Sequence, residues 1–180
     1  ATENLVRLKD IIVASDELRG LLTEEPTKSR ILLSNGTQYL AMPKSAAAIR
    51  GWARLKYVFL DEAAHYGILD DEPILASAKA RLANTNGYMD IASTPQGRRG
   101  FFYRTCLDAQ EGRIEVKYRE YSYHVALGKL ISEEFIDDAR KTLGPLFGQE
   151  FECEFMTSQT TLIPAELITQ SEQDYTMDEL

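Results

Sequence analysis

Two acidic side chains, Asp61 and Glu62, directly follow the continuous apolar run Tyr57-Val-Phe-Leu60. Such a run is typical of a strand buried on both faces, as in a parallel sheet. Ligands bind at the carboxyl ends of strands in open α/β sheets, so this strand predicts two carboxylates at a binding edge. Asp61 can hold Mg²⁺ directly or through water, and Glu62 can orient or deprotonate an attacking water. The pair fits triphosphate hydrolysis, although an acidic pair that caps a helix is the simpler alternative.

A second motif, Ser93-Thr94-Pro95, ends a second predicted buried strand over residues 88–92. Hydroxyl groups at the end of a neighbouring strand can contact a terminal phosphate or the attacking water. They can then transmit hydrolysis to the loop at residues 96–100. An ordinary turn would use the same three residue types. The two motifs in this order favour the hydrolytic interpretation.

The surrounding elements alternate between strands and helices, which predicts an α/β fold on a mostly parallel sheet flanked by helices. Asn35-Gly36 separates two β-prone runs and predicts a hairpin. Ser45 is placed to cap a short helix that ends at Arg50-Gly51. Further helices are predicted over residues 2–22 (with or without a break), 70–82, 101–109 and 132–144, and further strands over 113–121 and 147–155.

Composition restricts the class of protein. The 180 residues are 44% hydrophobic and 27% charged, which is typical of a globular chain and not of a disordered one. No apolar run approaches the roughly 20 residues of a membrane span, and the first residues do not predict a signal peptide. Cys106 and Cys153 are too few for a disulfide framework, which favours a reducing compartment. The two cysteines and the two histidines of the chain together also give no credible zinc site.

The negative charge is concentrated towards the carboxyl end. The whole chain has a net charge of -8, yet Lys141 is its last basic residue. We therefore expect a nucleic-acid contact on the first part of the chain, or on a domain outside this sequence. The acidic end is most simply a solvated surface.

Four segments, in the same order along the chain, resemble the ATPase domain of the large terminase subunit, the DNA-packaging motor of tailed viruses. Tyr57-Val-Phe-Leu-Asp-Glu-Ala-Ala64 resembles its Walker B strand with the catalytic Glu. Ile91-Ala-Ser-Thr-Pro-Gln-Gly-Arg-Arg-Gly-Phe-Phe-Tyr103 resembles its coupling motif. Ser45-Ala-Ala-Ala-Ile-Arg-Gly51 resembles the small-residue stretch before Walker B. Phe147-Gly-Gln-Glu-Phe-Glu-Cys-Glu-Phe155 resembles the segment that closes the ATPase domain.

The resemblance implies a P-loop NTPase-like fold of the additional-strand, catalytic-glutamate type, with ATP and Mg²⁺ as cofactors. It implies that Asp61 holds the metal and Glu62 activates water. It also implies that the Ser93-Thr94-Pro95 motif couples hydrolysis to movement. Arg50 would be a further catalytic residue, because a guanidinium can reach the phosphates of a neighbouring subunit in a ring. The alternative for Arg50 is a surface arginine that supports the turn before Gly51.

The implied function is translocation of double-stranded viral DNA into a procapsid. The expected partners are DNA, the portal protein, the small terminase subunit and further copies of the chain, with no membrane. The expected location is the host cytoplasm, with transient docking on the procapsid portal. Arg98 and Arg99, which lie between Gly97 and Gly100, are candidates for a DNA or phosphate contact. A solvated loop is the alternative for these two arginines.

The sequence departs from the family in one important respect, because no Gly-x-x-x-x-Gly-Lys-Ser/Thr motif occurs. Thr27-Lys28-Ser29 has only the ending of that motif and follows a predicted helix, so we interpret it as a loop. The family's P-loop would precede Ala1 and its nuclease would follow Leu180. We therefore expect residues 1–156 to be a partial ATPase domain, truncated at its N-terminus, and residues 157–180 an acidic linker or tail. Such a chain is expected to be inactive alone and to expose sheet edges.

Two other functions compete with this one. Asp61-Glu-Ala-Ala-His65 resembles the Asp-Glu-Ala-x-His box of superfamily-two helicases and translocases, and Ser93-Thr94 loosely resembles their Ser-Ala-Thr motif. The second ATPase-like lobe of those enzymes is not found in this sequence. The other alternative is a non-enzymatic α/β module that serves in assembly. His65 itself is either a switch residue or simply part of the loop that leaves the strand.

Overall fold

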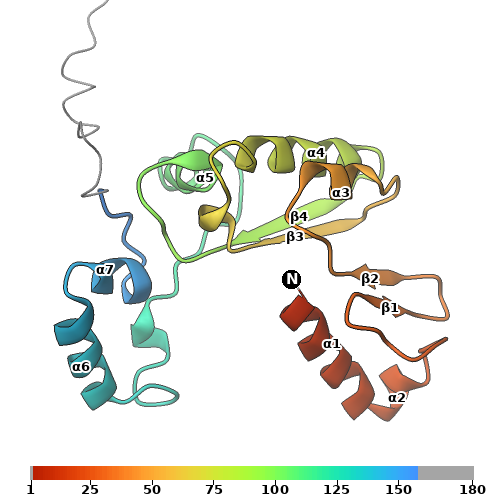
Figure 1. The fold of residues 1–180 in the computed structure, drawn as a ribbon, viewed down its shortest axis with the longest axis horizontal. Coiled ribbons are helices and arrows are strands. Elements are labelled where there is room, and N and C mark those ends of the chain that lie inside the picture. Colours follow the sequence, from red (N-terminus) through yellow and green to blue (C-terminus); the bar gives the residue numbers. More distant parts are fainter. Residues whose placement is uncertain (1, 158–180) are drawn as a thin grey trace, which may run out of the picture. The chain divides into compact units, whose positions relative to one another are not determined.

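The computed structural model describes residues 2–157, which fall into two compact units. Unit 1 consists of Ala1–Asp61 and Tyr66–Ile91, and unit 2 of Glu62–His65 and Ala92–Leu180, as far as each is described. The described chain is a mixed α/β structure with two small two-stranded sheets, one of them parallel (Figure 1). The predicted α/β class is confirmed at this level. Apart from residue 157, the predicted acidic tail lies outside the described residues.

Unit 1 begins with two consecutive helices, α1 (Thr2–Ala14) and α2 (Asp16–Arg19). They are separated at Ser15, whose backbone is extended and whose Oγ accepts a hydrogen bond from the Leu18 amide at 3.4 Å. A serine oxygen in this position satisfies an amide that the first turn of a helix leaves unpaired. The break that we allowed within residues 2–22 is therefore confirmed.

A β-hairpin follows, as the Asn35-Gly36 pair predicts. Strand β1 (Arg30–Leu32) pairs antiparallel with β2 (Gln38–Leu40), and Arg30 lies opposite Leu40. Gly36 has a φ of 83°, a left-handed conformation that glycine adopts without a steric penalty. The fully buried Ile31 of β1 joins Leu5 and Ile12 of α1 in one hydrophobic cluster. The hairpin is thus held by the apolar side of α1.

The second sheet of unit 1 pairs β3 (Tyr57–Asp61) with β4 (Tyr88–Ala92). Helices α3 (Ala46–Arg50) and α4 (Asp71–Ala83) lie on one face of this sheet (Figure 1). Ser45 caps α3 as predicted, because its Oγ accepts a hydrogen bond from the Ala48 amide at 3.1 Å. Val58 and Leu60 of β3 are buried on the side of α4, which contacts this strand.

The other side of β3 is not buried, which contradicts the predicted burial on both faces. Tyr57 and Phe59 are each 43% exposed, and Tyr88 of β4 is 67% exposed. The Tyr57 and Tyr88 rings pack at a centroid distance of 4.9 Å, and the Tyr57 hydroxyl donates to Asp90 at 3.0 Å. Burial of the hydroxyl, with help from this hydrogen bond, raises the pKa of Tyr57 to about 12. The prediction was wrong because helices cover only one face of the sheet within this unit.

Unit 2 contains the short 3₁₀ helix η1 (Ala63–His65) and helix α5 (Gly100–Gln110), which pack against each other. A second 3₁₀ turn, η2 (Tyr123–Val125), precedes α6 (Glu133–Leu143) and α7 (Leu146–Phe151). Ser132 caps α6, and α6 ends before Gly144, whose φ is 51°. Both ends of α6 agree with the prediction.

Two predicted strands of unit 2 are absent. Residues 113–121 have no regular secondary structure and pair with no strand among the described residues. Residues 146–151 form the helix α7 in place of an edge strand. The Phe147 and Phe151 rings stack at 5.0 Å, and Phe147 is buried with Ile136 and Ala139 of α6. The i, i+4 spacing of these two phenylalanines is the helical signal that the alternating pattern obscured.

Among residues 2–157, no helix is both long enough and apolar enough to cross a membrane.

Candidate functional site

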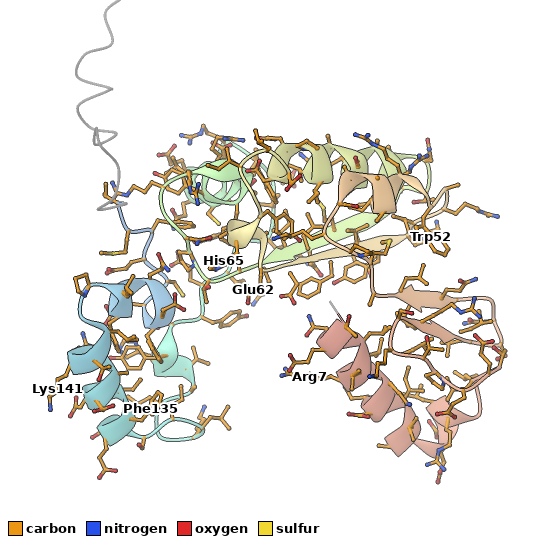
Figure 2. All side chains as sticks on the ribbon, in the orientation of Figure 1. Arg7, Trp52, Glu62, His65, Phe135 and Lys141 are labelled. Atoms are coloured by element: carbon orange, nitrogen blue, oxygen red, sulfur yellow. The ribbon has the colours of Figure 1, made fainter. Side chains whose placement is uncertain are left out.

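Glu62 is the first residue after β3, and its backbone conformation is unusual. Its φ of 53° is in the left-handed region, which residues other than glycine, asparagine and aspartate adopt rarely. The side chain is 61% exposed, so solvent or a ligand can reach the carboxylate. Figure 2 shows Glu62 and His65 on the short segment that leaves the sheet. Strained backbone of this kind persists where the surrounding structure enforces it, which is common at functional sites.

Ser93 holds the segment that carries Glu62. Its Oγ accepts a hydrogen bond from the Ala64 amide at 3.2 Å and lies 3.4 Å from Oε2 of Glu62, to which it donates. The residue therefore contacts both the backbone and the carboxylate of the candidate catalytic segment. Within unit 2, the structure thus brings together one acidic residue and one hydroxyl that the sequence analysis selected separately.

His65 and Thr94 form a second link between the same two segments. Nε2 of His65 lies 3.0 Å from Oγ1 of Thr94 and 3.7 Å from Oε2 of Glu62. The shorter distance is that of a hydrogen bond, and the longer one is that of an ion pair when the imidazole is charged. Pro95, the third residue of the predicted coupling motif, is buried. The motif is therefore anchored at its end and touches Glu62 and His65 through its two hydroxyls.

Asp61, the last residue of β3, belongs to unit 1. Its Oδ2 accepts a hydrogen bond from the Asn4 side-chain amide of α1 at 2.6 Å. Burial, together with the negative charge of Asp61, raises the pKa of Tyr66. Lys44 lies 5.2 Å from the centroid of the Tyr66 ring. Asp61 is therefore set in a polar environment and is only partly buried.

Asp61 can be compared with the ligands that Mg²⁺ requires. This ion usually keeps several waters and binds through one or two carboxylates together with phosphate oxygens. One carboxylate at a strand end fits that requirement, and Oδ1 of Asp61 is the oxygen that Asn4 does not contact. Among residues 2–157, no group of three or more His, Cys, Asp and Glu side chains could hold a metal alone. Asp61 thus fits the role of the single protein carboxylate on a Mg²⁺ ion whose other ligands are phosphate oxygens and water.

Arg50 closes α3 and is held by α4 of the same unit. Its Nε donates to Oγ of Ser77 at 3.0 Å, and its carbonyl accepts from Arg81 at 2.7 Å. Ser77 Oγ in turn donates to the Pro73 carbonyl at 2.7 Å. Arg50 is an exposed residue, and its bond to Ser77 uses Nε and not the two terminal nitrogens of the guanidinium. Whether they act on a neighbouring subunit remains a prediction.

Arg98 and Arg99 of the loop are both exposed, and Arg98 is also held by a hydrogen bond. Its Nε donates to the Phe155 carbonyl at 3.1 Å. Phe155 also packs its ring on Phe102 and Tyr103 of α5, at centroid distances of 5.9 and 5.0 Å. The loop at residues 96–100 is thus joined to the end of the described chain within unit 2. A DNA or phosphate contact by Arg98 and Arg99 stays a prediction.

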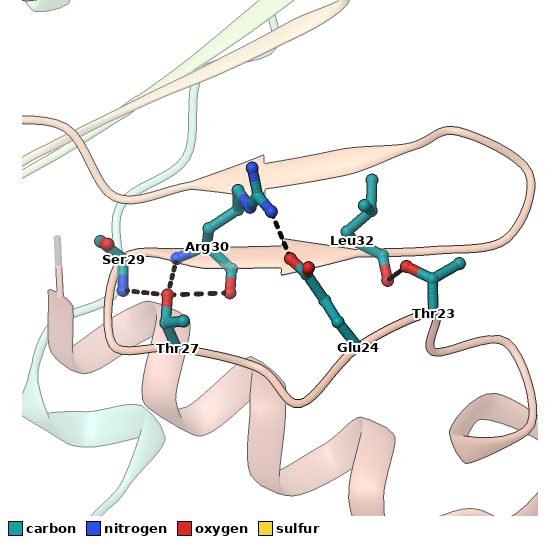
Figure 3. Close-up of polar contacts among 6 residues, drawn as sticks. All are labelled: Thr23, Glu24, Thr27, Ser29, Arg30 and Leu32. Atoms are coloured by element: carbon teal, nitrogen blue, oxygen red, sulfur yellow. Dashed lines mark hydrogen bonds and ion pairs between the residues drawn. The ribbon is translucent and has the colours of Figure 1, made fainter.

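Thr27 is the first residue of Thr27-Lys28-Ser29, the segment that has only the ending of a P-loop motif. In the structure, Thr27 stabilises a turn in unit 1. Its Oγ1 accepts hydrogen bonds from the amides of Ser29 at 3.3 Å and Arg30 at 3.0 Å (Figure 3). Thr23 and Glu24 bind the adjacent strand β1, at the Leu32 carbonyl and the Arg30 guanidinium. Because a side chain of the protein already occupies these amides, the geometry agrees with a structural loop.

Two of these contacts were not predicted from the sequence. His65 was interpreted as a switch residue or a loop residue and was not paired with Thr94. Asn4, which reaches Asp61 across 57 positions of sequence, had no predicted role. The i, i+3 spacing of Glu62 and His65 could have indicated that these two side chains approach each other, but it gives no signal for Thr94. No local pattern indicates the Asn4 contact, because it depends on the packing of α1.

Comparison of the chain with protein-family models and with curated proteins finds no match.

Proposed function

We propose that this chain is part of an ATP-hydrolysing, DNA-translocating motor of the large terminase type. The observation that carries the proposal is the contact of the Ser93 and Thr94 hydroxyls with Glu62 and His65. An exposed glutamate that follows a strand, held by a hydroxyl that follows the neighbouring strand, suits a base that must orient water. The P-loop-like fold, the cofactors and the partners named above are part of this proposal.

Each residue has a distinct role in the proposed reaction. Glu62 orients the attacking water and accepts its proton, and Ser93 fixes the carboxylate through Oε2. Asp61 would hold Mg²⁺, which supplies neutralisation of the charge on the phosphate oxygens when it is bound. The Ser93-Thr94-Pro95 motif transmits the change in Glu62 to the loop at residues 96–100. Arg50 reaches a neighbouring copy of the chain, and Arg98 and Arg99 lie against DNA.

The test is a comparison of ATP turnover between two proteins. One is the 180-residue chain, and the other is the same chain extended upstream of Ala1 to include a Walker A motif, if its gene encodes one there. We expect hydrolysis only in the extended protein, because phosphate binding needs main-chain amides and a lysine that residues 2–157 do not supply as a Walker A loop. Glu62→Gln should lower kcat at least about 10²-fold, the lower range for loss of a general base.

The same assay separates the alternatives. A superfamily-two helicase would be stimulated by single-stranded nucleic acid and would separate a duplex, whereas a packaging motor would respond to blunt double-stranded DNA. No hydrolysis in either protein, with both folded, would favour the non-enzymatic assembly module. Hydrolysis by the 180-residue chain alone would mean that another segment binds the phosphates, and the terminase assignment would be withdrawn.

A further inference from the structure

We propose that His65 is a positioning residue that connects the orientation of Glu62 to the position of Thr94. This inference rests on the proposed function and adds a residue to the same site. Nε2 of His65 lies between two oxygens, at 3.0 Å from Thr94 Oγ1 and 3.7 Å from Glu62 Oε2. One N–H group makes one good hydrogen bond, so it cannot fully satisfy both oxygens at once.

The geometry makes an exchange between these two partners easy. The two distances differ by less than 1 Å, so a small displacement of Thr94 would leave Glu62 as the better partner. When Nε2 carries the proton, the imidazole donates to Thr94 in one arrangement and to the carboxylate in the other. A carboxylate acceptor makes the stronger hydrogen bond once it is reached. Movement of the Ser93-Thr94-Pro95 motif would therefore change which group holds Glu62.

The backbone ensures that the exchange affects Glu62 specifically. The His65 amide donates to the Glu62 carbonyl at 3.0 Å, so His65 contacts Glu62 through both its main chain and its side chain. Ser93 and His65 both approach Oε2 of the carboxylate. The other oxygen, Oε1, is then the one that would face water. Loss of one of these two contacts to Oε2 would let the carboxylate rotate, while the Glu62 side chain would stay at the site.

The experiment uses the extended protein and steady-state ATP hydrolysis. His65→Leu removes the polar contact, whereas His65→Gln keeps a donor or acceptor near the position of Nε2. We expect His65→Leu to lower kcat about 10–100-fold, the usual effect of losing an outer partner that orients a reacting group. KM for ATP should stay within about twofold, because only orientation of the base is lost. His65→Gln should recover most of kcat.

Thr94→Val tests the other end of the link. If the two residues act as one unit, the double variant His65→Leu/Thr94→Val should be no slower than the slower single variant. His124→Leu is the matched control, because His124 is the chain's other histidine and lies in η2, with its ring stacked on Tyr123 at 4.0 Å. The control should hydrolyse ATP at the unaltered rate.

A second readout does not depend on activity. In the 180-residue chain, ¹⁵N NMR of the imidazole should show that Thr94→Val shifts the Nε2 resonance of His65 and leaves that of His124 unchanged. An unshifted Nε2, or a kcat that is normal in folded His65→Leu while Glu62→Gln is inactive, would overturn this inference and leave the proposed function standing. No hydrolysis by the extended protein would overturn both.

Discussion

At the scale of the residue, Glu62 combines a chemical role with a conformational cost. The same position carries the candidate base, a φ of 53° and the contacts from Ser93 and His65. A left-handed conformation costs a residue with a Cβ roughly 1–2 kcal/mol. The surrounding hydrogen bonds must offset that cost. This arrangement predicts that stability and hydrolysis respond in opposite directions to a change at position 62.

Glu62→Asn should stabilise the chain and abolish hydrolysis. Asparagine tolerates the left-handed region, so the variant should gain about 0.5–1 kcal/mol in the free energy of unfolding. Its shorter amide cannot accept a proton from water, so ATP turnover by the extended protein should be lost. Urea unfolding of the 180-residue chain, with the assay described above, measures both effects.

Glu62→Gln is the control that separates backbone strain from charge. It removes the same negative charge but keeps a long side chain at the same φ, so it should not be stabilised to the same extent. Equal stabilisation of both variants would show that loss of charge, and not relief of the backbone, was responsible.

At the scale of the element, close packing at Gly87 fixes where α4 ends and β4 begins. A Cβ at this position would lie 2.6 Å from the Lys56 carbonyl oxygen and 2.7 Å from Cδ2 of Leu82. The Gly87 amide donates to the Leu82 carbonyl at 3.0 Å, and the Tyr88 amide donates to the Lys56 carbonyl at 3.1 Å. The backbone that precedes β3 thus passes directly over this glycine. Its identity sets the spacing between the start of β3 and the end of α4.

Gly87→Ala should therefore destabilise the chain by about 1–3 kcal/mol, the usual range for overpacking. Chemical denaturation, with the slope checked for two-state behaviour, gives this value. Gly20→Ala is the matched control, since its Cβ would meet only carbonyl oxygens at 3.5 and 3.6 Å, which is ordinary contact. A smaller loss at Gly87 than at Gly20 would contradict the assigned role of this close approach.

The sequence predicted elements well where a local signal acts alone. The Ser45 and Ser132 caps, the Asn35-Gly36 hairpin and the strand before Asp61 all follow from residues within a few positions. The predictions failed where the structure of a segment depends on its contacts with segments that are distant in the sequence. Residues 113–121 alternate as a strand does, but a strand needs a partner, and none of the described residues supplies one. Of the site, the sequence placed Glu62 and Ser93 at the ends of two neighbouring strands but did not predict the hydrogen bond between them, and no local pattern indicated the Asn4 contact.

At the scale of the whole molecule, the β3–β4 sheet of unit 1 is smaller and more exposed than is usual. Each strand has one hydrogen-bonded neighbour, so each leaves one edge unpaired in the described residues. Parallel sheets are normally covered on both faces, and two-stranded sheets are marginal alone. Here Tyr57, Phe59 and Tyr88 stay exposed. Unpaired edges and exposed aromatic side chains both favour association with another chain.

We therefore expect the 180-residue chain to self-associate as its concentration rises, and Phe59→Lys to weaken this association at least about tenfold. Burial of a phenylalanine side chain contributes about 1.5–3 kcal/mol, and about 1.4 kcal/mol corresponds to a tenfold change in an equilibrium constant. Sedimentation velocity over a wide range of concentration measures the effect. Ile11→Lys is the matched control, because Ile11 is a 62% exposed residue of α1 and gains the same charge. If Ile11→Lys weakened association as much as Phe59→Lys, the cause would be net charge, because the sheet face is altered in only one of the two variants.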